Sequence, residues 1–375
     1  MMTLEEIRKD IDSVDAKLVA LFEERMKLAK EVALNKKETG KAVYDKEREL
    51  AKLSAVEQQV TKAENKQGIH DIFTQIMAVS RKYQYTLLSQ EETKKQGYTY
   101  QDTLQLGEDI KVVYQGIKGA NNEQAMVQFF GEDVHNFNVD KFEDVLIALE
   151  EGRADYGVLP VENSSAGAVA GVFDMITAHN VWVVGEEIVK VNHALLGVKG
   201  AKLEDIEVVY SHPQGLLQCA QYLNEAGFRQ VSLSNTAVSA KKVADEQDKT
   251  QAAVASERAA KLYGLEILKD HINFDATNST RFYILTKKKI VLKDSDKIGI
   301  SFQLPHECGS LYTILSHFAF NGLNLTSIMS TPLPNKPWEY RFFVEFKGNL
   351  LDPAVKNAIT GIKEETTEFR ILGNY

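Results

Sequence analysis

Apolar side chains recur every three or four residues through the first part of the chain, at Leu4, Ile7, Ile11, Val14, Leu18, Leu21, Leu28 and Val32. Steps of this size place the side chains on one helical face as a heptad seam, which is typical of paired helices. Gly40 and Gly68 divide residues 3–96 into three helical stretches, near 3–39, 42–66 and 69–96. We therefore predict an all-α first domain over residues 1–97.

The pattern changes twice further along the chain. From Ile110 onward, short Val, Ile and Tyr runs alternate with helical segments, which predicts an α/β domain with parallel strands over residues 108–288. After a basic stretch, a third pattern predicts an α+β domain over residues 296–375. Its expected elements are strand 298–304, helix 310–321, strand 325–331, strand 339–347, helix 352–364 and strand 367–372.

Composition excludes several classes of protein. The chain has 375 residues, of which 44% are hydrophobic and 26% charged, so it is neither a disordered chain nor a disulfide scaffold. A net charge of −9 argues against a nucleic-acid partner. Its two cysteines, Cys219 and Cys308, lack metal-ligand spacing, so no metal site is expected. No secretory signal or apolar run of about 18 residues is evident, so we expect a cytoplasmic protein without membrane contact.

Arg25 occupies a core position of the apolar seam. A buried guanidinium costs several kcal/mol unless it meets an anion or an acceptor, so we expect either a carboxylate from the bundle or an anionic ligand beside it. Arg8 and Lys36 lie on roughly the same helical face, but about 42 Å of helix separates them. One helix cannot bring both to a small ligand. We therefore predict a helical dimer with two shared pockets, each taking Arg8 from the neighbouring subunit.

Further polar side chains lie on helical faces in the second and third stretches. Ser80 and Gln84 continue an apolar face at helical spacing, while Asp45, Arg48 and Glu49 occupy adjacent turns. Taken alone, the last three are typical of a solvated charge cluster. Their combination with the cations of the first stretch is harder to explain in that way.

This layout resembles the all-α chorismate mutase family over residues 3–90. The implied substrate-binding residues are Arg8, Arg25, Lys36, Asp45, Arg48, Glu49, Ser80 and Gln84. The resemblance implies an intertwined dimer in which the arginines bind the carboxylates of chorismate, and Lys36 and Gln84 act on the ether oxygen as catalytic groups. The remaining acidic and hydroxyl side chains would orient the ring hydroxyl, a carboxylate and the cations. Such a rearrangement needs conformational restraint and charge stabilisation, but no cofactor.

Polar loops follow four strands of the second region, at residues 158–165, 208–214, 231–236 and 252–257. Each loop by itself is typical of a helix N-cap. Together, at the carboxyl ends of parallel strands, they predict an anion-binding crevice. A Walker or dinucleotide fingerprint is absent from the sequence, so we do not expect a bound nucleotide.

Three motifs of this region resemble the prephenate dehydratase family: Glu-Asn-Ser at 162–164, Ser-His-Pro-Gln at 211–214 and Thr-Arg-Phe at 280–282. The resemblance implies two α/β lobes of binding-protein type with prephenate between them, and a cofactor-free decarboxylation with loss of the ring hydroxyl. It makes Thr280 the catalytic donor to the departing hydroxyl and Arg281 a group for a carboxylate or for holding the cleft. The other implied substrate-binding residues are Asn163, Ser164, Ser211 and Gln214.

The βαββαβ order predicted over 298–372 resembles an ACT domain, an amino-acid-binding module. The implied effector-binding residues are Gly309, Ser310, Leu311, Ser330 and Pro332. Met329 and Thr331 stand where that family has Glu and Arg, so a charged pair is missing. Phenylalanine is the expected effector, and a purely structural dimerisation domain is the alternative.

The leading hypothesis is a bifunctional enzyme of phenylalanine biosynthesis, at least dimeric, that makes prephenate from chorismate and converts it to phenylpyruvate without a cofactor. An active mutase fused to a non-catalytic sensor of an aromatic metabolite is the second hypothesis. A DNA-linked regulator is the third, and it lacks a basic recognition helix.

Overall fold

The computed structural model describes residues 2–88, 97–107, 109–334 and 336–375. The chain divides into two compact units. Unit 1 contains Met1–Gly97 and Asp296–Ile371, and unit 2 contains Tyr98–Ser295 and Leu372–Tyr375. Within the described ranges, no helix combines the length and apolarity needed to cross a membrane.

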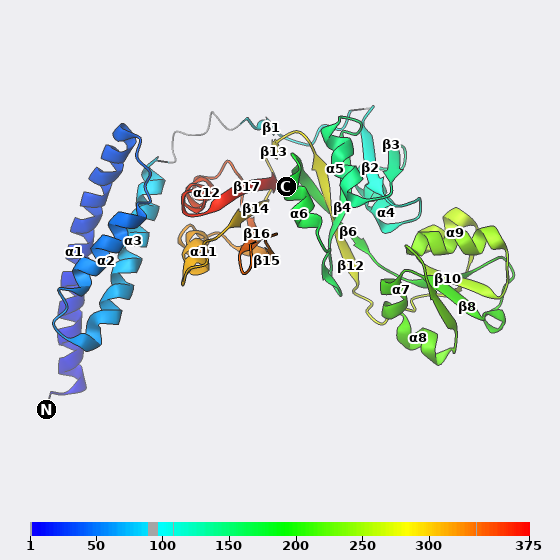
Figure 1. Cartoon of the computed structure of the whole chain (residues 1–375), viewed down its shortest axis with the longest axis horizontal. Coiled ribbons are helices and arrows are strands. Elements are labelled where there is room, and N and C mark those ends of the chain that lie inside the picture. Colours follow the sequence, from blue (N-terminus) through cyan, green and yellow to red (C-terminus); the bar gives the residue numbers. More distant parts are fainter. Residues whose placement is uncertain (1, 89–96, 108, 335) are drawn as a thin grey trace. The chain divides into compact units, whose positions relative to one another are not determined.

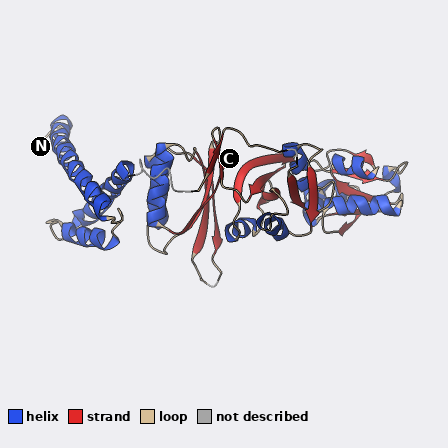
Figure 2. Ribbon diagram, turned by 90° about the horizontal axis from the view of Figure 1, so that it is seen from above, coloured by secondary structure: helices blue, strands red, loops and turns tan. Residues whose placement is uncertain are grey.

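Helices alone form the N-terminal part of unit 1 (Figure 2). Helix α1 (Leu4–Thr39) begins with a capping box between Thr3 and Glu6 and ends at Gly40. That glycine has a φ of 67°, a left-handed conformation that suits a helix C-terminus. Asp45 caps α2 (Lys46–Glu57) by accepting a hydrogen bond from the backbone N–H of Arg48.

Two predicted helix boundaries are wrong. α2 ends at Glu57 rather than near residue 66, and a short 3-10 helix, η1 (Ala63–Asn65), leads into α3 (Lys66–Leu88). Gly68 lies inside α3 instead of preceding it, because one glycine costs a long helix only about 1 kcal/mol. Residues 89–96, which were predicted to continue the third helix, lie outside the described residues.

The apolar seam of α1 is largely exposed. Only Ala29 and Ala33 are buried along its 36 residues. Leu4, Leu18, Leu21 and Leu28 are each about 60% exposed. A single copy of the chain therefore leaves most of this helix face without a packing partner.

The C-terminal part of unit 1 has the predicted βαββαβ order (Figure 1). Its elements are β14 (Lys297–Gln303), α11 (Ser310–Phe320), β15 (Leu325–Pro332), β16 (Tyr340–Lys347), α12 (Pro353–Glu365) and β17 (Thr367–Asn374). The strand order is β15-β16-β14-β17, and β16 pairs antiparallel with both β14 and β15. The last residues of β17 belong to unit 2.

Helix α12 packs closely on α11 and α3. Gly361 makes this approach possible, because a Cβ atom there would lie 2.4 Å from Cε1 of His317 and 3.0 Å from Cε2 of Tyr85. The side chains of His317 and Tyr85 are both buried, and their ring centroids lie 6.1 Å apart. The contact thus depends on a residue without a side chain.

Unit 2 contains two lobes, each with its own sheet. In the first lobe the strand order is β6-β12-β4-β2-β3, and the sheet carries α4 (Asn121–Phe130), α5 (Phe142–Glu150) and α6 (Val172–Ala178). Its strands are β2 (Lys111–Gln115), β3 (His135–Val139), β4 (Tyr156–Asn163), β6 (Trp182–Lys190) and β12 (Ser279–Thr286), with the short β5 (Gly167–Ala168) beside β4.

The second lobe has the strand order β11-β7-β10-β8-β9. Its strands are β7 (Ala194–Gly197), β8 (Val208–Ser211), β9 (Arg229–Ser232), β10 (Gln251–Ala255) and β11 (Glu266–Lys269). Its helices are α7 (Pro213–Gln218), α8 (Ala220–Glu225), α9 (Thr236–Glu246) and α10 (Glu257–Tyr263). A separate strand pair joins β1 (Thr99–Gln101) to β13 (Ile290–Leu292).

The expectation of parallel strands is confirmed only in part. β2 runs parallel to β3 and β4, and β8 runs parallel to β9 and β10. β12 is antiparallel to both β4 and β6, because the chain returns from the second lobe to insert a central strand into the first. In the second lobe, β7 runs antiparallel to both β10 and β11, so both sheets are mixed.

We expect Gly361→Ala to destabilise unit 1 by about 1–3 kcal/mol, because the added methyl group overpacks the contact between α12, His317 and Tyr85. Calorimetry of the full chain should show one transition at a lower temperature. Lys363→Ala, an exposed position two residues further along α12, is the control and should leave the transition in place. A Gly361→Ala transition at or above that of the wild type would contradict this account.

Candidate active sites

A pocket of about 290 Å³ lies among α1, α2 and α3. Seven of the eight residues predicted for the first site line it: Arg25, Lys36, Asp45, Arg48, Glu49, Ser80 and Gln84. They come from three separate helices, and apolar side chains such as Val32 and Met77 complete the wall. The seven predicted residues therefore bring three cations, two carboxylates and two polar groups into one pocket.

Arg25 is half-buried in this pocket. Its Nη1 donates to Oγ of Ser80 and, at 3.5 Å, to the carbonyl oxygen of Ile76. Burial lowers the pKa of Arg25, and the carboxylate of Glu49 partly opposes that shift. The guanidinium stays charged because its ordinary pKa is so high. Because both of its acceptors are neutral, its positive charge remains available to bind an anion.

Lys36 lies on the same side of α1, about three turns further along. Its Nζ donates to the carbonyl oxygen of Val43 at 2.6 Å. Burial lowers the pKa of Lys36, while Asp45 and other carboxylates nearby raise it. The ammonium is thus partly desolvated, which strengthens its interaction with a ligand in the pocket.

Gln84 offers unused hydrogen-bonding capacity. Its side chain is buried, and among the described residues its Oε1 atom has no hydrogen-bond partner. A buried amide oxygen without a partner costs free energy, so a hydrogen-bond donor on a ligand in the pocket would relieve that cost. Gln84 and Ser80 lie one helical turn apart on α3, which aims both into the pocket.

Arg8 does not line the pocket of its own chain. It lies near the start of α1, about 42 Å of helix away from Lys36, as the sequence predicted. In contrast, Arg81 and Lys52 line the pocket, although neither was predicted from the sequence as a site residue. Arg81 follows Ser80 directly, but its ion-pair partners come from α2 and α12, so sequence spacing did not reveal its role.

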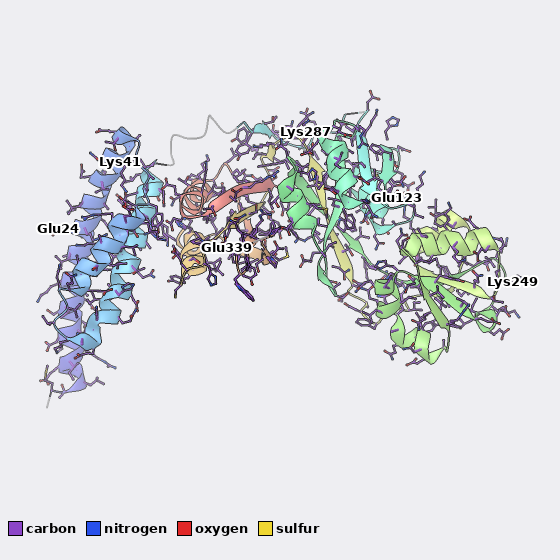
Figure 3. The ribbon with its side chains drawn as sticks, in the orientation of Figure 1. Glu24, Lys41, Glu123, Lys249, Lys287 and Glu339 are labelled. Carbon is purple, nitrogen blue, oxygen red and sulfur yellow. The ribbon has the colours of Figure 1, made fainter. Side chains whose placement is uncertain are left out.

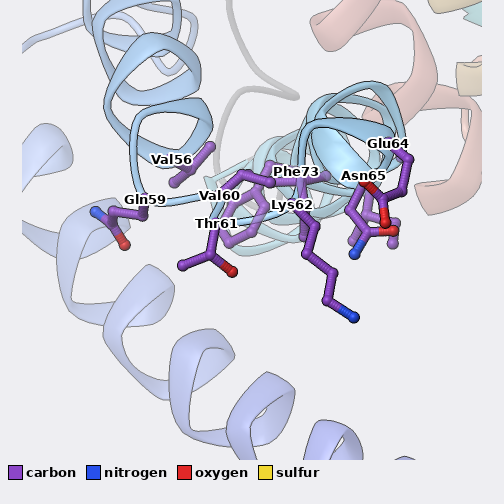
Figure 4. Close-up of a pocket in the computed structure, with 11 residues that line it drawn as sticks. Val56, Gln59, Val60, Thr61, Lys62, Glu64, Asn65 and Phe73 are labelled. Carbon is purple, nitrogen blue, oxygen red and sulfur yellow. The ribbon is translucent and has the colours of Figure 1, made fainter.

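A second hollow of about 490 Å³ lies where α2 ends and α3 begins (Figure 4). Its apolar lining comes from Val56, Val60, Ile69, Ile72 and Phe73. It contains none of the residues predicted for the first site, and its polar lining is not a group of convergent cations. It therefore lacks the chemistry for an anionic substrate.

Asn163 is the centre of the polar site in unit 2. Thr280 on β12 pairs in register with Asn163 on β4. Asn163 Nδ2 donates to Oγ1 of Thr280 at 3.0 Å and to Oδ1 of Asn278 at 2.8 Å. The hydroxyl of Thr280 thus accepts from the protein, which leaves its proton free to be donated to a ligand.

A hydrogen-bonded chain joins this site to the second lobe. Gln218 Nε2 on α7 donates to Oγ of Ser165 at 3.0 Å, and Ser165 Oγ lies 2.8 Å from Oδ1 of Asn163. Behind it, His193 Nε2 lies 3.0 Å from Oε1 of Gln218. Burial lowers the pKa of His193, so its imidazole stays neutral and serves as a hydrogen-bonding group.

A second connection between the lobes is ionic. Arg258 on α10 binds Glu123 on α4 through two contacts of 2.7 Å, Nε to Oε2 and Nη2 to Oε1 (Glu123 is labelled in Figure 3). The backbone N–H of Gly119 also donates to Glu123. The hydrogen bonds from Arg258 and Gly119 outweigh the effect of burial and hold the pKa of Glu123 below its ordinary value. The two lobes are thus joined by an ion pair as well as by hydrogen bonds.

The structure does not bring all predicted dehydratase residues together. Ser164 is close by, since its Oγ accepts from the backbone N–H of Ser279 at 2.9 Å. Ser211 is fully buried and donates to the carbonyl oxygen of Val254 at 2.7 Å. Gln214 lies half-buried in the first turn of α7, where its backbone N–H donates to Nδ1 of His212.

Arg281 points away from Thr280, because neighbouring residues of a strand face opposite sides of the sheet. Its guanidinium contacts Glu162 at 2.9 Å and Glu186 at 3.2 Å. Of the two roles expected for Arg281, this geometry favours holding the strands over binding a substrate carboxylate. Asn278, Ser165, Gln218 and His193 were not predicted, and only their contacts across the site reveal them.

In the third region, Ser310 and Leu311 line a small cavity of about 90 Å³ together with the aromatic side chains of Trp338, Tyr340 and Phe342. Gly309 caps α11 in a left-handed conformation with a φ of 81°. Ser330 and Pro332 lie on the edge strand β15 and do not line this cavity. The five predicted effector residues therefore do not meet in one cavity of a single chain.

Two family models match separate parts of the chain. Residues 7–85 match the family model for chorismate mutase type II, and residues 112–290 match that for prephenate dehydratase. The chain is 34% identical to a bifunctional chorismate mutase/prephenate dehydratase of Aquifex aeolicus, over 100% of this chain and 98% of that protein.

Two solved structures resemble about 70% of the chain. A prephenate dehydratase of Arthrobacter aurescens in complex with L-Phe has a TM-score of 0.66 and 27% identity, over 71% of this chain and 89% of that one. A protein described as a quorum quenching acylase, GqqA, has a TM-score of 0.65 and 29% identity, over 70% of this chain and 96% of that one. Relatedness along the whole length, together with the two sites, shows that the chain belongs to the bifunctional chorismate mutase/prephenate dehydratase family.

Proposed function

We propose that the pocket of α1–α3 rearranges chorismate to prephenate, and that the site around Asn163 and Thr280 converts prephenate to phenylpyruvate. The observation that carries the proposal is the convergence of seven predicted residues from three helices on one pocket. Partly buried cations destabilise a small bundle unless anions accompany them, and Arg25 and Lys36 donate only to neutral acceptors, which favours an anionic ligand beside them.

The mutase pocket acts by restraint and electrostatics. Arg25 and Arg48 bind the two carboxylates, which holds chorismate in its compact conformer. Lys36 and the amide of Gln84 stabilise the negative charge that develops on the ether oxygen as its bond to carbon breaks. Glu49 and Asp45 orient the ring hydroxyl and the cations. The reaction is intramolecular, so none of these residues forms a bond to the substrate.

The dehydratase site acts by proton donation to a leaving group. Thr280 transfers its proton to the ring hydroxyl of prephenate, which departs as water while the carboxylate leaves as carbon dioxide and the ring becomes aromatic. A proton taken up from solvent restores the threonine hydroxyl. Asn163 holds the threonine hydroxyl in place from the opposite strand. The contact between Gln218 and Ser165 keeps the second lobe over the site.

The exposed seam of α1 supports an intertwined dimer of two copies of this chain. Leu4, Leu18 and Leu21 are each more than half exposed, and Arg8 lies too far from the pocket of its own chain to act there. An antiparallel α1 from a second copy covers the seam and brings its Arg8 to the pocket. The apolar hollow of Figure 4 adds surface that the second copy can cover.

The third region is proposed to be an ACT domain that binds phenylalanine. Its element order fits that fold, and the cavity at Ser310 and Leu311 has aromatic walls suited to an aromatic amino acid. The dehydratase of Arthrobacter aurescens was solved with L-Phe. Ser330 and Pro332 lie on an exposed edge strand, where a second copy can complete the site.

Two reciprocal substitutions test the division of labour, with chorismate and prephenate supplied separately. Arg25→Ala removes a cation from the first pocket and should lower mutase kcat/KM at least 100-fold while dehydratase activity persists. Thr280→Val keeps the β-branched shape but removes the hydroxyl. It should lower dehydratase kcat/KM while mutase activity persists. Lys30→Ala on α1 is the control for the first variant, and Thr280→Ser, which keeps the hydroxyl, is the control for the second. Loss of both activities in a folded variant would contradict the assignment.

Mixed dimers test the shared pocket. Arg8→Ala and Arg25→Ala homodimers should both be inactive as mutases, because every pocket lacks one cation. A heterodimer of the two has one pocket with both arginines intact, so about half of the wild-type mutase activity per dimer should return. Purified heterodimers that stay inactive would show that Arg8 does not cross between subunits.

Phenylalanine at millimolar concentration should raise the melting temperature of the wild type and inhibit the dehydratase reaction. Leu311→Asp places a charge in the cavity at α11 and should weaken both effects, while Leu351→Asp, an exposed leucine on another part of the region, should not. The alternative, a purely structural domain, predicts no response to phenylalanine in the wild type.

A further inference from the structure

Helix α12 ends in two carboxylates that contact the walls of the mutase pocket. Glu364 and Glu365 belong to the C-terminal part of unit 1, more than 270 residues after α3. Neither residue lines the pocket itself. However, Glu365 contacts Arg81 and Glu364 contacts Val43, and both of these residues line the pocket.

Glu365 reaches the pocket through Arg81. Arg81 Nε donates to Oε1 of Glu365 at 2.9 Å, and Arg81 Nη1 donates to Oε2 of Glu49, a pocket residue on α2. The side chains of Glu365 and Arg81 are 3% and 8% exposed, so solvent screens this pair weakly. His317 Nε2 on α11 lies 3.3 Å from the same oxygen of Glu365.

The charged states of Glu365 and Arg81 depend on one another. Burial disfavours the charged form of Arg81, but Glu365 and Glu49 outweigh burial and raise its pKa. Burial also disfavours the ionised form of Glu365, but His317 and Arg81 hold its pKa below the ordinary value. Arg81 is therefore shared between one carboxylate in the mutase pocket and one outside it.

Glu364 reaches the pocket through the segment that joins α1 to α2. Its Oε2 atom accepts hydrogen bonds from the backbone N–H groups of Val43 and Tyr44, at 3.0 Å and 3.1 Å. The carbonyl oxygen of Val43 in turn accepts from Nζ of Lys36. Tyr85 donates to the same oxygen of Glu364 at 3.1 Å. Glu364 thus fixes the peptide segment to which the ammonium of Lys36 is bonded.

We propose that Glu364 and Glu365 are positioning residues for the mutase reaction, so that the C-terminal region sets the geometry of Glu49 and Lys36 in the mutase pocket. Without Glu365, Arg81 is left with a single counter-charge and draws on Glu49 alone. Without Glu364, the backbone of Val43 loses a hydrogen bond that holds its carbonyl group in position to accept from Lys36. The inference rests on the mutase function proposed for this pocket.

Other contacts join the same two parts of unit 1 without reaching the pocket. Lys82 Nζ donates to Oγ of Ser316 at 2.7 Å, and Asn357 Nδ2 donates to Oγ1 of Thr86 at 2.9 Å. These contacts attach α11 and α12 to α3. Ser316→Ala removes one of them and is therefore a matched control for the loss of attachment alone.

The test measures both activities of the full chain in Glu365→Gln, Glu364→Ala and Ser316→Ala. Glu365→Gln should lower mutase kcat/KM about tenfold, equivalent to about 1.4 kcal/mol of transition-state stabilisation. Glu364→Ala should lower mutase kcat about threefold or more through Lys36. Dehydratase activity with supplied prephenate should stay within twofold of the wild type in all three, and Ser316→Ala should leave both activities unchanged.

A double-mutant cycle separates positioning from general stability. If Glu365 acts through Arg81 on Glu49, then adding Glu365→Gln to Glu49→Gln should cost much less than tenfold. Additive losses, or mutase kcat/KM within twofold of the wild type in both single variants, would overturn the proposal. A wild-type protein that makes no prephenate from chorismate would instead overturn the proposed function itself, so the two failures are distinct.

Discussion

Cations that are partly withdrawn from water constrain the first site more than any other feature. Arg25, Lys36 and Arg81 lie among apolar side chains, where each charge is destabilised unless the protein supplies acceptors. The chain supplies a hydroxyl to Arg25, a peptide carbonyl to Lys36 and carboxylates to Arg81. The hydrogen-bond acceptors supplied to Arg25 and Lys36 are neutral, so both side chains can also bind an anionic ligand.

The helical part also leaves much apolar surface uncovered in a single chain. A bundle of α1–α3 is too thin to cover both faces of a 36-residue helix, and its apolar seam remains exposed. Burying a large apolar side chain is worth about 1.5–3 kcal/mol, so several uncovered leucines favour association with a second copy. In the proposed dimer, assembly and catalysis are linked, because the second copy that covers the seam also supplies Arg8 to the pocket.

The dehydratase site uses hydrogen bonds where the mutase pocket uses charge. Asn163 and Thr280 face each other across two antiparallel strands, and Gln218 extends the network to the second lobe. A buried network of this kind is stable only when nearly all of its members are satisfied. The unpartnered Nδ2 of Asn278 and Nδ1 of His193, among the described residues, mark where a polar ligand atom or water would complete it.

Local pattern was enough to predict much of this protein. The βαββαβ order of the C-terminal region and the long first helix follow from periodicity, because periodicity depends on neighbours along the chain. Seven of the eight residues that the family resemblance implied line one pocket. Tertiary structure decided the rest. Pairing between strands that are distant in sequence decides three features. These are the antiparallel insertion of β12, the burial of Ser211 and the contact of Arg281 with Glu162. The ion pairs from Glu365 through Arg81 to Glu49 join residues from three distant segments. Such pairs cannot be predicted from the periodicity of the sequence.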